Sequence, residues 1–241
     1  MEDIELTGIV LSTIPYKEKD KLIHIFSVEL GLITGILKGV ASPKAKLKFA
    51  GQPFCFGKFD LTTSHDFYLV KGVESIDTFF DLTLDYDNFK LCNFMLEICK
   101  VILKPNIISE KLFLDLLKTL QNVVYNNTDA KISLLKFVTN VLEIIGYKIN
   151  FDTCDNCNMK FMGDIKFDFE SGTHRCANCS HGTSITRQEF LALKIVAESD
   201  ILKINTIRLK PEIISRLLKM QVYNLSQRLN YKFKSVDLSE L

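Results

Sequence analysis

Two closely spaced cysteine pairs restrict what this chain can fold into more than any other feature. Cys154 and Cys157 form the first pair, Cys176 and Cys179 form the second, and eighteen residues separate the pairs. A two-residue spacer turns both sulfurs of a pair toward one point, and a second pair completes a tetrahedron around Zn²⁺. Because four protein ligands leave no position for water, the spacing predicts one structural zinc ion in a small ribbon-like element.

Other uses of paired cysteines stay open at this point. Four cysteines also suit an iron–sulfur cluster, and a single pair suits thiol redox chemistry, although the strand–helix–strand pattern of redox motifs is absent. His174 or His181 in place of one ligand is a further alternative, but we expect both histidines to be exposed. The other three cysteines lie in apolar patterns and are expected to be buried: Cys55, Cys92 and Cys99.

The composition describes a folded protein that stays out of the membrane. Of the 241 residues 47% are hydrophobic, so the chain is long and apolar enough to bury a core. No stretch of eighteen residues is free of charge, which argues against a transmembrane helix. The acidic first five residues do not resemble a secretory signal. We therefore expect a cytoplasmic protein whose seven cysteines stay reduced.

Charge is distributed in opposed blocks, although thirty basic residues nearly balance twenty-nine acidic ones. Residues 60–100 contain eight acids and three lysines, whereas residues 201–234 contain eight basic residues and one acid. Residues 30–59 have no acid and five lysines: Lys38, Lys44, Lys46, Lys48 and Lys58. Two basic faces on a neutral protein favour a polyanionic partner, and the alternative is that these lysines only solvate the surface.

Hydrophobic periodicity divides the chain into parts. Residues 1–80 contain five short alternating runs, at 5–11, 21–26, 31–37, 54–61 and 67–70, which predict a small closed barrel with a loop at 39–51. Alternation places Phe54 and Phe56 on one face, in the core, so Phe49 is the better candidate for stacking on a base.

Helical periodicity begins at about residue 84. Three helices are expected before residue 148, the third capped by Asp129 and ended by Gly146, and two more at 187–198 and 211–229. The fold class is therefore α+β. The predicted division is a barrel at 1–80, a helical domain at 81–149 that continues at 186–241, and a four-cysteine insert at 150–185.

No set of residues resembles a catalytic site. Phosphate-binding glycine loops, dinucleotide fingerprints and nucleophile elbows are all missing from the sequence. Asp81, Asp85 and Asp87 are a possible nuclease metal site, but turn and helix N-cap positions explain them better. We predict that the protein is not an enzyme.

Several short strings, in this order, resemble the bacterial recombination mediator family RecO. They are Tyr16 to Leu22, Phe26 with Gly31 and Leu32, Lys38 to Ala41, Pro53 with Phe54, and Gly146 with Tyr147 just before the first cysteine pair. The family's order of barrel, helices and four-cysteine element also matches. Ala41 stands where the family has arginine, and lysine, as a point charge, contacts phosphate with less geometric specificity.

The resemblance implies an OB-fold barrel and a role in DNA repair and homologous recombination. RecO-like proteins bind single- and double-stranded DNA without ATP and anneal complementary strands. They contact the acidic tail of single-stranded DNA-binding protein (SSB) and, with RecR, help to load RecA, in the cytoplasm at the nucleoid. The DNA contacts would be the five lysines and Phe49, and the tail would meet Lys136 and Phe137, unless Phe137 is helix core. The alternative function is a zinc-stabilised protein-interaction scaffold without affinity for nucleic acid.

Overall fold

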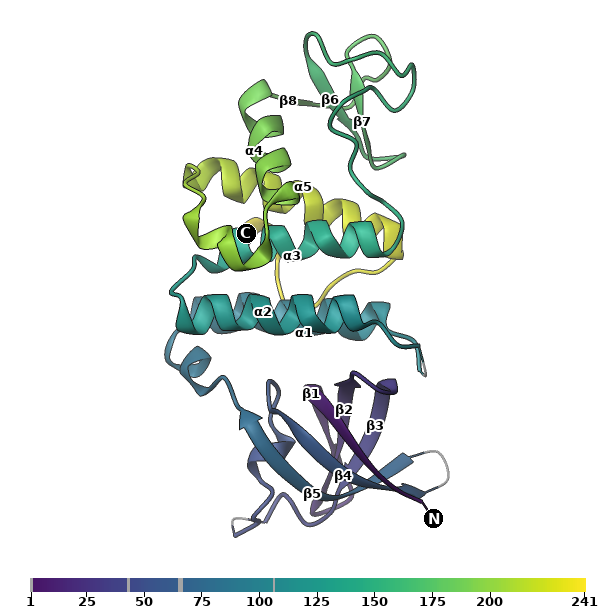
Figure 1. Cartoon of the computed structure of the whole chain (residues 1–241), viewed down its shortest axis with the longest axis vertical. Helices are drawn as coiled ribbons and strands as arrows, with labels where there is room; N and C mark the ends of the chain where they lie inside the picture. Colours follow the sequence, from purple (N-terminus) through teal and green to yellow (C-terminus); the bar gives the residue numbers. More distant parts are fainter. Residues whose placement is uncertain (1, 43, 65–66, 106) are drawn as a thin grey trace. The chain divides into compact units, whose positions relative to one another are not determined.

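Five strands of the computed structural model close into a barrel in the order β1-β2-β3-β5-β4 (Figure 1). They are β1 (Asp3–Tyr16), β2 (Asp20–Ser27), β3 (Gly31–Leu37), β4 (Phe56–Ser64) and β5 (Phe67–Asp77). Neighbours are antiparallel except β3 and β5, which pair in parallel at Gly35–Tyr68 and Ile36–Leu69. This closure confirms the predicted OB-like barrel.

The structure describes residues 2–42, 44–64, 67–105 and 107–241. Contacts within the chain define two units, Met1–Leu117 and Lys118–Leu241, and each is described here by itself. Among the described residues, no helix is long and apolar enough to cross a bilayer. The four-part division expected from the sequence stays a prediction.

Side chains from all five strands fill the barrel. Ile23, Ile25 and Phe59 are among its fully buried residues. One expectation about this core was wrong: Phe54 and Phe56 do not share the face of a strand. Phe54 has a left-handed backbone (φ 71°) and precedes β4, so its ring packs edge-on against Phe89.

Gly31 occupies a position that no other residue fits well. Its φ is +70°, which side chains rarely adopt, and an added Cβ would lie 2.3 Å from the carbonyl oxygen of Ile107. The close approach lets the end of the β2–β3 turn lie against the segment after the first helix.

Two helices follow the barrel in sequence. A short 3₁₀ helix (η2, Phe80–Leu84) leads into α1 (Tyr86–Ile102), and α2 covers Glu110–Tyr125. The Asp85 side chain accepts hydrogen bonds from the first-turn amides of α1, so the prediction of a capping acid is confirmed. Lys100 of α1 donates to Ser12 Oγ of β1 at 2.9 Å.

The second unit is built around α3 (Ala130–Ile144), which packs against α4 (Arg187–Glu198) and α5 (Pro211–Leu229). Asp129 caps α3, and Gly146 (φ +93°) follows its end, as predicted. A reciprocal capping box of Thr186 and Glu189 starts α4. The apolar face predicted for the last helix is buried: Ile214, Leu217, Leu218, Val222 and Leu225.

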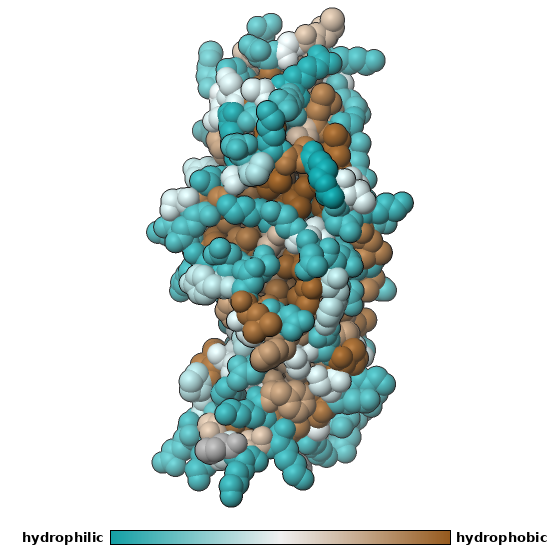
Figure 2. Space-filling view, turned by 90° about the vertical axis from the view of Figure 1, so that its left-hand side faces the viewer, coloured by the Kyte–Doolittle hydropathy of each residue, from teal (hydrophilic) through white to brown (hydrophobic). Residues whose placement is uncertain are grey.

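A three-stranded sheet lies between α3 and α4 in sequence. Its strands are β6 (Ile165–Asp168), β7 (Thr173–Cys176) and β8 (Thr183–Ile185), in the order β7-β6-β8. Gly172 has φ +68° in the β6–β7 turn, a backbone conformation that glycine adopts readily. On the face drawn in Figure 2, hydrophobic side chains reach the surface among hydrophilic ones, which is common in folded proteins.

Candidate metal centre and nucleic-acid interface

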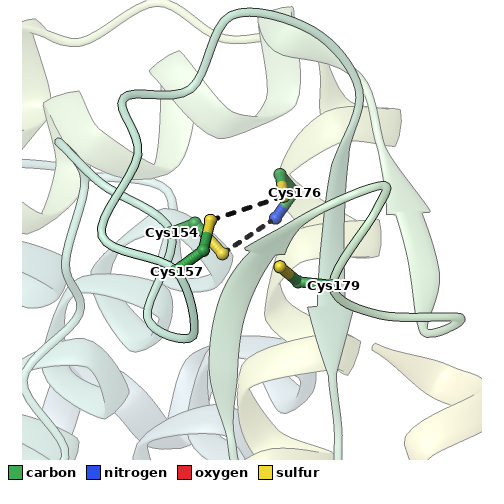
Figure 3. Close-up of side chains that lie close together, drawn as sticks. All are labelled: Cys154, Cys157, Cys176 and Cys179. Carbon is green, nitrogen blue, oxygen red and sulfur yellow. Dashed lines mark hydrogen bonds between the residues drawn. The ribbon is translucent and has the colours of Figure 1, made fainter.

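The four paired cysteines come together in the second unit. All four sulfurs lie within 4.8 Å of one another, and Cys157 Sγ is 3.9 Å from Cys176 Sγ (Figure 3). Sulfurs at about 2.3 Å from one tetrahedral ion would be roughly 3.8 Å apart, so the donor set fits a single metal ion. The spacing is too wide for disulfides, and all four are free thiols.

Local backbone bonds shape each half of this centre. Cys154 N–H donates to the carbonyl of Met159, and Cys179 N–H donates to the carbonyl of Cys176, both at 2.9 Å. The two halves also meet directly, because Cys176 N–H donates to Cys154 Sγ at 3.3 Å. The chain is thus folded so that two separate loops aim their sulfurs at one point.

Electrostatics prepare one cysteine as a ligand. Burial opposes ionisation of Cys154, but backbone N–H groups of Cys157, Cys176 and Asn156 outweigh it and lower the pKa of this thiol to about 6. The thiolate is the form that binds metal. The three cysteines outside the cluster, Cys55, Cys92 and Cys99, are buried among apolar residues, as expected. Burial raises the pKa of Cys55 to about 11 and that of Cys92 to about 12.

The expectation that His174 is exposed was wrong, whereas His181 is exposed. His174 is 1% exposed and its ring lies among those of Phe151, Phe167 and Phe190. Burial lowers the pKa of His174 to about 4, so the ring is neutral at pH 7. Alternation of β7 turns this residue to the aromatic side of the sheet, and it is not part of the cysteine cluster.

Arg228 of α5 fastens the ribbon to the helices. Its guanidinium donates to the carbonyls of Phe169 (2.6 Å) and Glu170 (2.7 Å) and lies over the ring of Tyr147. Sequence reasoning placed Arg228 only in a basic block. The lone signal for this role is its position one helical turn after Asn224, the residue to which its Nε donates.

We expect Arg228→Ala to loosen the ribbon without unfolding the helices. The change removes two charge-assisted hydrogen bonds, each worth about 1.5–3 kcal/mol, and leaves two carbonyls unpaired. Hydrogen exchange measured by mass spectrometry should show faster exchange at residues 165–176. The control is Arg208→Ala, which removes an arginine that donates to the nearby carbonyl of Asn205. Equal hydrogen-exchange rates at residues 165–176 in the two variants would contradict the proposed role of Arg228 in holding the ribbon.

In the first unit, residues 38–42 and 44–51 (the lysine loop) lie between β3 and β4. Backbone bonds of 3.0–3.3 Å at three-residue intervals fold it into turns through Gly39, Ser42, Ala45, Lys48 and Gly51. Its second half contains a short 3₁₀ helix, Phe49–Gly51. The loop is therefore a folded element and not a strand, as the sequence predicted.

Both ends of the lysine loop are fixed to the barrel. Gly39 N–H donates to Asp20 Oδ1 (2.8 Å), and Ala41 N–H donates to the carbonyl of Lys19 (3.0 Å). At the other end, Thr13 Oγ1 (3.1 Å) and Lys21 Nζ (3.3 Å) donate to the carbonyl of Gly51. These bonds hold the loop beside the turn between β1 and β2.

The lysines of this loop are available to an anion. Lys38, Lys44, Lys46 and Lys48 are all exposed. Over the described part of the chain, none of these four ammonium groups forms an ion pair. Phe49 is half-buried and packs against the barrel core, so only part of its ring is accessible.

The structure sets Lys58 apart from the loop. It lies on β4, opposite Thr7 of β1 and opposite Glu74 of β5. The lysine loop meets β1 at Thr13, six residues from Thr7, or about 20 Å along a strand. Lys58 therefore belongs to another, more acidic part of the barrel surface.

Two lysines that sequence reasoning did not select adjoin the loop. Lys17 and Lys19 are exposed in the β1–β2 turn, and the Lys17 ammonium lies 5.2 Å from the ring centroid of Tyr16. Sequence reasoning selected lysines from a window without acids, and Glu18 between Lys17 and Lys19 lowers the local net charge of this turn. Together with the lysine loop they make one basic surface.

Lys136 and Phe137 both lie inside the second unit. Phe137 is fully buried, and Lys136 is 5% exposed, with its Nζ donating to the carbonyl of Ala197 at 2.7 Å. This carbonyl belongs to the last turn of α4, where carbonyls lack partners within the helix. The geometry gives the pair a packing and capping role and does not present it to a partner.

We expect Lys136→Met to destabilise the second unit by about 1–3 kcal/mol, because a helix-end carbonyl loses its buried cationic donor. Urea unfolding followed by circular dichroism measures the difference. Lys203→Met, at an exposed lysine of the 3₁₀ helix η3 (Ile201–Thr206), is the control and should change stability by less than about 0.5 kcal/mol. Equal midpoints for the two variants would argue against the capping role.

These features define a class: an OB-like barrel with a basic loop, followed by a helical domain that contains a four-cysteine element able to hold a metal ion. Comparison with known families gives the same order of parts. The family model "Recombination protein O N terminal" matches residues 1–79, and "Recombination protein O C terminal" matches residues 83–237. The chain belongs to the recombination protein O (RecO) family.

Curated relatives agree over nearly the full chain. A DNA repair protein RecO of Clostridium novyi is 27% identical over 96% of this chain and 91% of its own length. The namesakes of Clostridium perfringens and Caldicellulosiruptor saccharolyticus are each 24% identical over 98% of this chain, and over 96% and 98% of their own lengths. Family membership supports a role in DNA repair and recombination.

Proposed function

We propose that this protein is an ATP-independent DNA-binding mediator that anneals complementary strands. The observation that carries the proposal is the lysine loop, a folded element whose exposed lysines form no ion pair among the residues that the structure describes. Cations held at fixed positions neutralise phosphates and release counterions, which favours both single and double strands regardless of sequence. The half-exposed ring of Phe49 adds a surface on which one base can stack.

Strand annealing is compatible with a protein whose sequence has no nucleotide-binding motif. Base pairing is downhill once two strands meet, so the protein needs only to neutralise both backbones and hold them close. The sequence contains no phosphate-binding glycine loop. The proposal includes a non-enzymatic role in the cytoplasm, at the nucleoid.

The metal in this proposal is a single structural Zn²⁺ held by Cys154, Cys157, Cys176 and Cys179. Four thiolates around one point select zinc over magnesium or calcium. A cluster of several irons with bridging sulfides would push the two cysteine pairs further apart than the 4.8 Å observed. The bound ion would stabilise the ribbon, whose short strands have little core of their own.

A strand-annealing assay without ATP tests the function. Complementary oligonucleotides, one carrying a fluorophore and the other a quencher, should pair faster with the protein than alone. The acceleration should fall as salt rises, because phosphate contacts release counterions. If the protein neither accelerates pairing nor binds a phosphate-rich column in dilute salt, the scaffold alternative is the better explanation.

Contacts with other recombination proteins, RecR and through it RecA, are part of the same proposal. For the acidic tail of SSB, a cavity of about 620 Å³ between α5 and residues 232–238 fits better than the buried Lys136 and Phe137. Val222, Val236 and Leu238 supply apolar walls, and the charged lining residues are two lysines, Lys232 and Lys234, and one acid, Asp237. An apolar side chain and the carboxylates of a tail would find complementary groups there.

A synthetic tail peptide can decide between these two places. Lys232→Glu with Lys234→Glu should weaken its binding by about tenfold or more, measured by fluorescence anisotropy. Lys136→Met should leave the affinity unchanged if the protein is kept well below its unfolding midpoint. The opposite result would indicate that the tail binds at Lys136 and Phe137 of α3.

A further inference from the structure

A second surface of the first unit has the opposite character to the lysine loop. Four large apolar side chains within eleven residues are more than half exposed: Ile76 (54%), Phe80 (65%), Leu84 (75%) and Tyr86 (74%). We call residues 76–87 the acidic–aromatic patch. Single exposed apolar residues are common, but a gathered group with a polar rim is typical of a protein-interaction site.

The patch is held in shape from below. Phe79 and Leu82, three residues apart, are 1% and 2% exposed and anchor the 3₁₀ helix η2. Phe79 is the left-handed residue before η2 (φ 47°), and the Leu82 N–H donates to its carbonyl at 3.1 Å, whereas the Phe80 ring that follows is exposed. Asp77 Oδ1 accepts the N–H of Phe79 (2.8 Å), and Thr83 Oγ1 donates to the carbonyl of Phe80 (2.7 Å). The exposed rings therefore sit on an ordered frame.

The charge around the patch excludes nucleic acid as its occupant. Residues 72–89 contain five acids and no lysine, arginine or histidine. Asp81 and Asp87 are exposed beside Phe80 and Tyr86 in sequence. Carboxylates repel phosphate, so DNA on the lysine loop would leave this surface uncovered. Complementarity instead calls for lysine or arginine around an apolar centre.

We propose that the acidic–aromatic patch is a docking site for a second protein, one that presents an apolar helix face rimmed by lysine or arginine. Phe80, Leu84 and Tyr86 supply the apolar contact, and Asp81 and Asp87 select a basic partner and set its orientation. The proposal is independent of DNA annealing, because it concerns other residues and a partner of opposite charge.

Two designed peptides serve as probes. One is an amphipathic helix with leucine and phenylalanine on one face and lysine at both rims, and the other has glutamate in place of each lysine. The full-length, zinc-loaded protein should bind the lysine peptide at least about tenfold more tightly than the glutamate peptide, measured by fluorescence anisotropy. Phe80→Ser with Tyr86→Ser should weaken lysine-peptide binding by about tenfold or more.

Two controls keep the result specific. Leu191→Ser with Ile195→Ser removes apolar side chains of similar exposure (48% and 50%) from α4, and binding should be unchanged. DNA annealing should also be unchanged in the Phe80 and Tyr86 variant, which separates this proposal from the first. Absence of binding, equal binding by the variant, or preference for the glutamate peptide would overturn the proposal. So would self-association in sedimentation velocity that the double substitution abolishes, because the occupant would then be a second copy.

Discussion

Replacing Cys179 by serine is expected to abolish metal binding and to unfold the ribbon while the barrel stays folded. Loss of one thiolate leaves an incomplete tetrahedron, and the free energy of metal binding is what holds so small an element in shape. Metal content measured by mass spectrometry should fall from about one ion per chain to near zero. Amides of residues 150–185 should exchange rapidly, and those of β1 to β5 should keep their protection.

Serine at Cys55 is the matched control, because that cysteine is buried in the barrel and is not a ligand. This variant should keep its metal and lose only barrel stability. Treating the wild-type protein with a chelator should reproduce the Cys179→Ser exchange pattern. A Cys179→Ser protein that retained a full equivalent of metal would contradict the assigned ligand set.

The largest loss of DNA binding is expected from Lys44→Ala combined with Lys46→Ala and Lys48→Ala. Removing up to three phosphate contacts should reduce the salt slope by up to about 3 and lower affinity in dilute salt by about 10²–10³-fold, for every sequence tested. Fluorescence anisotropy at several salt concentrations measures both quantities. Stability should hardly change, since these side chains are exposed.

A matched variant separates the loop from net charge. Lys71→Ala with Lys148→Ala and Lys160→Ala also removes three exposed lysines, and two of them are in ion pairs with Asp3 and Glu143. Its salt slope should stay near that of the wild type. If both triple variants lose affinity equally, general electrostatics and not the lysine loop accounts for binding. Lys58→Ala, beside Glu74, should change affinity by less than about twofold.

Periodicity and spacing predicted most of the fold. Barrel strands were found because one face of each is buried, and α4 and α5 have the predicted bounds because Thr186 and Pro211 mark their starts. The cysteine cluster was predicted from spacing alone, since two-residue spacers dictate local geometry. These features depend on short-range rules, which a sequence displays directly.

Long-range placement was beyond those rules. Nothing near His174 in the sequence shows that three phenylalanines from β6, α4 and residue 151 surround it. The left-handed backbone of Phe54 likewise breaks an alternation that looked continuous. Lys136 was expected to meet a partner's tail, but it is buried, and the Ala197 carbonyl that accepts its hydrogen bond lies 61 positions along the chain. Tertiary contacts decide such positions.

The anchoring of the lysine loop has a consequence for how binding is tuned. Its backbone already has its hydrogen bonds before any ligand arrives, so association restricts only side-chain rotamers, at up to about 2 kcal/mol for each lysine. A loop that was disordered before binding would also lose backbone conformational entropy when it bound DNA. DNA affinity should therefore depend on the length and head group of individual side chains. Lysine-to-arginine substitutions in the lysine loop should raise this affinity without changing the backbone conformation of the loop.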